Sequence, residues 1–154
     1  MFSKGRMEAC LWRSGIDRSS NSGWAAYELL TMLAERQLAL SQSAILDSVA
    51  TFEHIRAQWR HLALQAEADF RVIEAVCSDE ALLRRRVAGR RRGIPGWPEL
   101  SCEEVAEVRA RYEPWTQERL VLDAVMPLDV NLACLWAYLD RSPSGAVALH
   151  QQVR

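Results

Sequence analysis

The sequence has few of the features that mark secreted, membrane-spanning or metal-binding proteins. Its four cysteines lie far apart with no C-x-x-C pair, which favours reduced thiols over a disulfide framework or a zinc site. No apolar run approaches the length of a membrane span, and the first ten residues carry charges where a secretory signal would be apolar. We therefore expect a cytoplasmic protein with no metal site and no membrane partner.

Lysine and excess charge of either sign are also scarce. Lys4 is the only lysine among nineteen basic residues, and twenty acidic residues leave a formal net charge of −1. This balance argues against a protein whose whole surface binds nucleic acid or anionic lipid. With 154 residues, 49% of them hydrophobic, the chain is expected to form one globular domain over residues 1–140, followed by a loose tail at 141–154.

Short apolar runs alternate with helical periods along the chain. Strands are predicted at Ser43–Asp47, Phe70–Cys77 and Leu120–Asp123. Helices are predicted at 24–40, from Phe52, from Ser78, from Ser101 toward Tyr112, and from Pro127. Parallel strands need long crossovers of this kind, so the pattern indicates an α/β fold in which helices pack on a parallel sheet.

Polar residues mark where several of these helices should begin. Ser22 and Ser78 are the expected N-caps of the first and third helices. Ser101 and Glu104 have the spacing of a capping box, in which each side chain bonds to the other residue's backbone N–H.

Carboxylates stand at the ends of the predicted strands. Asp47 and Asp123 end the first and third predicted strands, and the segment 77–79 lies at the end of the second. Ligands of open parallel sheets bind outside the carboxyl ends of the strands, so these three strand ends are expected to face one rim.

The densest cluster of charge is the arginine block from Arg84 to Arg92. Arg86 and Arg90 are four residues apart, so on a helix they would share a face and could clamp a phosphate chain. Alternatively, the block is a solvated helix face balanced by the acidic segment 99–107.

Residues 41–140 resemble the later part of a P-loop small-molecule kinase of the AAA-type ATPase group, similar to chloramphenicol phosphotransferase, gluconate kinase and zeta toxin. The matching segments are 44–49, 77–82 with the arginines that follow, 111–115, and 122–123 before Pro127. The resemblance implies an ATP-dependent phosphotransferase with ATP, Mg²⁺ and a small-molecule substrate as ligands. It also implies a mobile lid over about residues 84–112, with Arg86 and Arg90 on the phosphates and the loop Asp123–Pro127 near the adenine.

The chain departs from that family at its catalytic centre. It contains no G-x-x-x-x-G-K-[ST] loop, which would hold the phosphates and Mg²⁺. Residues 3–12 resemble the segment after the family's second strand, where Gly5 and Glu8 replace the usual Asp base and Arg.

The resemblance therefore implies a domain that lacks its first, central strand and its P-loop. That strand would lie between the strands at 43–47 and 70–77, which must otherwise pair directly or leave backbone groups unpaired. We expect no ATP or Mg²⁺ on the chain as given. A wrong start site, a frameshift and true decay all remain open.

Asp47 is the best remaining catalytic carboxylate in this interpretation. A strand-end hydrogen-bond acceptor is the alternative role for it. The acceptor substrate and the oligomeric state do not follow from the sequence.

A second hypothesis is a non-enzymatic module that binds RNA or an acidic partner through Arg84–Arg92 and Trp97. The net charge argues against nucleic acid. Trp59 and Trp136 lie on apolar helix faces and are expected in the core rather than on a binding surface.

Overall fold

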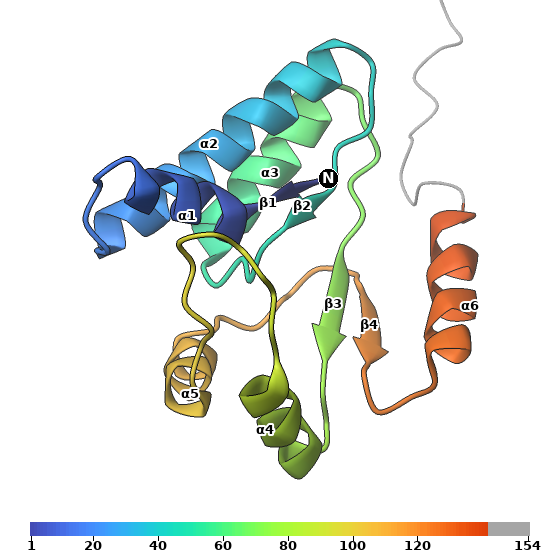
Figure 1. The fold of residues 1–154 in the computed structure, drawn as a ribbon. Coiled ribbons are helices and arrows are strands. Elements are labelled where there is room, and N and C mark those ends of the chain that lie inside the picture. The colour runs from blue at the N-terminus through green and yellow to red at the C-terminus, as the bar shows by residue number, and fades with distance from the viewer. Residues whose placement is uncertain (142–154) are drawn as a thin grey trace, which may run out of the picture. The chain divides into compact units, whose positions relative to one another are not determined.

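The computed structural model describes residues 1–141, in which helices alternate with short strands (Figure 1). The mixed α/β class predicted from the sequence is confirmed. The elements are β1 (Phe2–Ser3), α1 (Lys4–Arg13), α2 (Ser20–Ala39), β2 (Leu46–Asp47), α3 (Glu53–Gln65), β3 (Ile73–Val76), α4 (Glu80–Gly89), α5 (Cys102–Ala110), β4 (Leu120–Asp123) and α6 (Leu128–Leu139).

The strands form two separate parallel pairs. β1 pairs with β2, with Phe2 opposite Leu46, and β3 pairs with β4, with Ile73 opposite Leu120. Direct pairing between the strands at 43–47 and 70–77, one of the two expected outcomes, does not occur in residues 1–141. The partner of β2 is instead β1, whose two residues are too few to show a strand period in the sequence.

The described chain divides into two compact units. The first comprises Met1–Phe70 with Asp79–Gln117, and the second comprises Arg71–Ser78 with the residues from Glu118 onward. The first unit therefore holds β1, β2 and the helices α1 to α5, while the second holds β3, β4 and α6. Of the predicted tail at 141–154, only Arg141 falls within the described residues.

The core of the first unit lies between α2 and α3. Leu30 is fully buried on α2, and Ile55 and Trp59 of α3 pack with it in one cluster. The Trp59 indole N–H donates to the Thr31 hydroxyl at 2.9 Å, which satisfies its one polar atom. The predicted core position of Trp59 is confirmed.

A fully buried arginine joins α3 to the chain segments around it. The Arg56 side chain donates to the carbonyl oxygens of Ala50 at 2.7 Å and Thr51 at 3.3 Å. Its guanidinium carbon lies 4.2 Å from the ring centroid of Trp115 and 4.9 Å from that of Tyr112. The residues after α5 are therefore held against the start of α3 by cation–π contacts as well as by packing.

The same segment also caps α3. The helix begins after Phe52, whose side chain makes no capping bond. The Glu113 carboxylate accepts the Glu53 N–H instead, and the Glu113 N–H donates to the Thr51 carbonyl at 3.0 Å. An anion at this position also interacts favourably with the helix dipole.

Two of the predicted helix caps are wrong and one is confirmed. Ser19, not Ser22, precedes α2, because the Ser22 hydroxyl is buried inside the helix and bonds to the Ser19 carbonyl. Asp79 rather than Ser78 caps α4, accepting the Leu82 N–H at 2.9 Å. Ser101 forms the predicted capping box at the start of α5.

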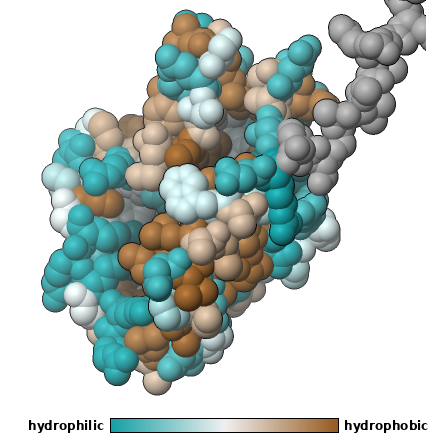
Figure 2. Space-filling view, turned by 90° about the vertical axis from the view of Figure 1, so that its right-hand side faces the viewer, coloured by the Kyte–Doolittle hydropathy of each residue, from teal (hydrophilic) through white to brown (hydrophobic). Residues whose placement is uncertain are grey.

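Two apolar segments are less buried than their patterns indicate. The predicted strand at 43–47 is reduced to β2, and Ile45 before it is 63% exposed. On α6 the predicted core residue Trp136 is 61% exposed, because the helix has no packed layer over that face in the described residues. Figure 2 views the side that carries α6 and shows hydrophobic residues on its surface.

None of the described helices is both long and apolar enough to span a bilayer.

Replacing Arg56 by leucine should destabilise the first unit by about 3 kcal/mol, because the Ala50 carbonyl loses the Arg56 donor, the Thr51 carbonyl keeps only the Glu113 N–H, and the cation–π contacts with Tyr112 and Trp115 are lost. Chemical denaturation should show this loss as a lower midpoint. Arg36→Leu, at an exposed position on α2, is the matched control and should shift the midpoint little. Equal midpoints for the two variants would contradict the structural role of Arg56.

Candidate functional site

Asp47 lies at the end of β2, opposite Ser3 of β1, and is exposed. The turn that follows it is unusual. The Ser48 hydroxyl is buried without a hydrogen-bond partner among the described residues, and Ala50 has a φ of 47°, in the left-handed region that non-glycine residues rarely adopt. Asp47 therefore presents a carboxylate at the strand end, next to a turn held by the carbonyl contacts of Arg56.

In the second unit, two strand ends meet as the sequence predicts. One carboxylate oxygen of Asp123, at the end of β4, accepts the N–H of Ser78 at 3.1 Å and that of Val125 at 3.0 Å. The hydrogen bonds from Ser78 and then from Val125 lower the pKa of Asp123 below its ordinary value. Asp123 is thus ionised at neutral pH and ties the β3 end to the turn after β4.

The predicted adenine loop, Asp123–Pro127, is a compact turn. Pro127 is the N-cap of α6, and its carbonyl accepts the Asn131 N–H at 3.1 Å. The Asn131 side chain also donates to the Asp123 carbonyl at 2.9 Å. These bonds leave the outer surface of the turn exposed, so it is able to contact a ligand. Asp123 and Pro127 belong to the second unit, whereas Asp47 belongs to the first.

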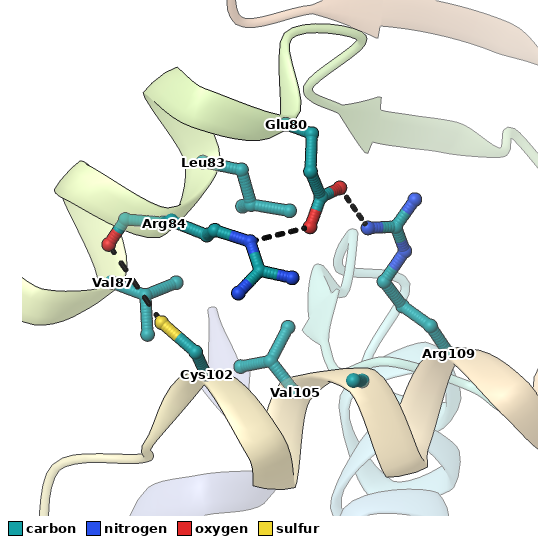
Figure 3. Close-up of a pocket in the computed structure, with 8 residues that line it drawn as sticks. Glu80, Leu83, Arg84, Val87, Cys102, Val105 and Arg109 are labelled. Atoms are coloured by element: carbon teal, nitrogen blue, oxygen red, sulfur yellow. Dashed lines mark hydrogen bonds and ion pairs between the residues drawn. The ribbon is translucent and has the colours of Figure 1, made fainter.

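The expected lid is a pair of helices, α4 and α5, that line a pocket (Figure 3). The Glu80 carboxylate bridges Arg109 at 2.8 Å and Arg84 at 3.3 Å, and these arginines, Arg109 foremost, lower the pKa of Glu80. Leu83, Val87 and Val105 form the apolar part of the lining. The pocket therefore lies between α4 and α5, and the Glu80–Arg109 ion pair joins the two helices across it.

The predicted arginine clamp does not have the expected geometry. Helix α4 ends at Gly89, and Arg90 has an extended backbone with φ −69° and ψ 137°. Arg86 lies in the last helical turn and is exposed, so Arg86 and Arg90 do not share a helix face. Gly89 is the sequence signal for this helix end, because glycine favours the end of a helix over its interior.

The loop after α4 contains contacts that the sequence did not predict. Glu99 accepts the Arg92 backbone N–H at 2.5 Å and the Arg92 side chain at 3.3 Å, and the Arg92 backbone contact chiefly lowers the pKa of Glu99. Trp97 stacks on Trp12 of α1, with ring centroids 4.7 Å apart and an interplanar angle of 13°. In the sequence, the acidic segment 99–107 indicates a possible partner for the arginines, but no motif or spacing connects Trp12 with Trp97.

Beneath Trp12, α1 and α2 enclose a small polar cluster. Glu8, only 6% exposed, forms an ion pair with Lys4 and accepts the Ser22 hydroxyl at 3.4 Å. The Trp12 indole N–H donates to the same hydroxyl at 2.9 Å. Glu8 is therefore a buried carboxylate with its charge neutralised by the single lysine of the chain.

The described residues offer no ready metal site. Within residues 1–141, no group of three or more histidine, cysteine, aspartate or glutamate side chains is arranged to hold a metal ion. The chemistry that these residues can support is recognition of an anion by arginines.

Comparison with known proteins gives one family. A family model described as an AAA domain matches residues 6–115, well over half of the chain. No curated protein and no solved structure matches.

We predict that Asp123 titrates below the ordinary aspartate value of 3.8. A carboxylate with a depressed folded-state pKa contributes stability above its unfolded pKa, and this contribution is lost as the pH falls through the folded value. NMR titration of the Asp123 carboxyl should show the low midpoint.

The variant Asp123→Asn tests the same point by stability. It should weaken the acid dependence of the melting temperature of the second unit, while Asp17→Asn, an exposed change in the first unit, should not. A midpoint at or above 3.8 for Asp123 would show that the strand-end contacts do not form.

Proposed function

The chain belongs to the AAA domain family, and on that basis we propose that it is the lid and acceptor portion of a P-loop kinase-like phosphotransferase that uses ATP and Mg²⁺. The family match over residues 6–115 carries the proposal. The order of elements supports it, since each parallel strand pair is accompanied by crossover helices and the helix pair α4 and α5 lies between β3 and β4 in the chain.

The proposal includes the absence of the first strand and the phosphate-binding P-loop from residues 1–154. Residues 1–154 contain no G-x-x-x-x-G-K-[ST] sequence. Phosphoryl transfer depends on positioning and charge neutralisation, so the absence of loop, lysine and metal-binding hydroxyl leaves little catalysis. We infer that a strand and a Gly-rich loop, which residues 1–154 do not contain, would complete the domain.

The strand pairing supports this inference. Within residues 1–141, β2 has only β1 as a partner, and β3 has only β4. Two-stranded pairs are marginal on their own, and parallel strands normally occur in larger sheets covered on both faces. A further parallel strand would supply hydrogen-bond partners to edges that now have none from the described strands.

Each candidate site residue receives a role in the completed domain. Arg86 and Arg90 neutralise charge on the transferring phosphate, Asp47 takes the proton of the acceptor or orients it, and the Asp123–Pro127 turn lies along the adenine. Arg86 and Arg90 would reach the phosphate from the end of α4 and from the following loop, instead of from one helix face.

RNA binding through Arg84–Arg92 and Trp97 is less well supported. One face of the Trp97 ring is taken by Trp12, and Arg92 is held by Glu99. The groups that would stack on a base or pair with a phosphate are therefore partly engaged within the protein.

The proposal predicts that millimolar MgATP does not raise the melting temperature of residues 1–154 alone. The upstream DNA, read in all frames, should encode an apolar strand and a loop ending in Gly-Lys-Ser or Gly-Lys-Thr, and the chain extended by that segment should be stabilised by MgATP. Stabilisation of the short chain with phosphate turnover would contradict the proposed deficit. Stop codons with no such loop in any frame would leave decay as the explanation.

In the extended chain, Arg86→Ala and Arg90→Ala should each lower phosphate turnover by about a thousandfold, the lower range for an arginine that stabilises the transferring phosphate. ATP affinity should change far less. Arg85→Ala, at an exposed position on the same helix, is the matched control and should retain turnover. Equal turnover in all three variants would remove the lid arginines from the mechanism.

A further inference from the structure

We propose that the loop between α4 and α5, which we call the strap, is held on α1 by the Trp12–Trp97 stack, an interaction that we call the latch. The strap must be released before Arg90 and Arg92 can reach a ligand. The latch is a property of the chain as it stands, while the nature of the ligand as a phosphate rests on the proposed function. In Figure 1 the loop, drawn in olive to yellow, runs beside α1.

Two contacts hold the strap to α1, and a glycine allows the close approach. The indole rings of Trp12 and Trp97 overlap nearly in parallel, at 4.7 Å between centroids. The Arg13 guanidinium donates to the Pro95 carbonyl at 2.5 Å. Gly96 has a φ of +77°, and a Cβ there would lie 2.8 Å from the Arg13 side chain, so glycine allows the loop to approach α1 this closely.

Gly5 leaves room for the stacked ring. A Cβ at this position would lie 3.9 Å from atoms of the Trp97 ring, which is an ordinary van der Waals contact. A longer side chain would occupy the space that the ring fills. A small residue at position 5 is thus required for the strap to lie flat on the helix.

Guanidinium groups lie over both indoles. The Arg18 guanidinium is 4.5 Å from the Trp12 ring centroid, and that of Arg92 is 5.4 Å from the Trp97 ring centroid. Arg92 is also paired with Glu99, so the latched loop keeps this arginine engaged with an internal carboxylate. An anionic ligand would have to compete with Glu99 for it.

Unpaired donors distinguish this strap from a permanently fixed connection. Arg90 Nε, Arg92 Nη2 and Trp97 Nε1 are all buried, and none has a hydrogen-bond acceptor among the described protein groups. Buried donors without acceptors are costly, so the latched loop retains a driving force toward a state in which they are satisfied. Release into solvent, or onto a ligand with several acceptor oxygens, would provide that state.

Trypsin supplies a direct test, because the strap contains Arg90, Arg91 and Arg92. The rate of cleavage after these residues, measured by mass spectrometry on the folded chain without nucleotide, reports how often the strap opens. We expect Trp97→Ala and Trp12→Ala to raise that rate about tenfold. Trp136→Ala, which removes an exposed indole on α6, is the control and should leave it unchanged.

A second pair of variants tests the latch without removing a tryptophan. Gly5→Ala should keep the wild-type cleavage rate, whereas Gly5→Leu should raise it as far as Trp97→Ala does. The exciton-coupled circular dichroism of the stacked indoles should persist in Gly5→Ala and disappear in Gly5→Leu and Trp97→Ala. If the alanine variants fail to fold, Trp97→Phe retains a smaller ring and should give an intermediate rate.

Equal cleavage of the wild type and Trp97→Ala, or unchanged indole coupling in Gly5→Leu, would overturn the latch. Neither result would bear on nucleotide binding, because no nucleotide is present. Conversely, an extended chain that fails to bind MgATP would reject the proposed phosphotransferase and leave the latch measurements standing.

Discussion

The buried guanidinium of Arg56 is the constraint on which the first unit depends. An arginine removed from water needs partners for its N–H groups and its charge. Here two carbonyls of the turn after β2 accept hydrogen bonds from Nε and Nη2, two aromatic rings after α5 lie against the guanidinium, and the Glu53 carboxylate lies 3.8 Å from Nη1. One side chain therefore fixes the turn that follows Asp47 and anchors the segment that follows α5. Packing of Leu30 and Trp59 fills the neighbouring core, but apolar contact alone would not specify where these two segments lie.

The regular elements follow from local patterns, and their failures have local causes. The period of α3 places Trp59 in the core, and the spacing of Ser101 and Glu104 specifies the start of α5. β1 could not be predicted, because two residues are too few to show the alternation of a strand. Ser22 has the residue type of an N-cap, but it lies inside α2, where its hydroxyl donates to the Ser19 carbonyl. Trp136 lies on an apolar stripe, yet a stripe is buried only where another layer covers it.

The candidate site was predictable only where it depends on strand ends. Asp123 and Ser78 meet because adjacent parallel strands end at the same edge. The arginine clamp was not predictable from spacing alone, since Gly89 ends α4 before Arg90 is reached. The Trp12–Trp97 stack joins residues far apart in the chain, and no periodicity or motif records such a contact. Contacts between the ends of adjacent parallel strands could thus be predicted from the sequence, whereas the end of α4 and the Trp12–Trp97 contact could not.

Capping of α3 by Glu113 couples the segment that follows α5 to the stability of the core. Glu113 supplies the anion at the start of α3, while Tyr112 and Trp115 on either side of it cover Arg56. Any displacement of this short segment uncaps a helix and exposes a buried cation together. If a ligand binds only when α5 and the segment after it move, part of its binding free energy is spent on uncapping α3 and exposing Arg56. Its affinity is lowered by that amount.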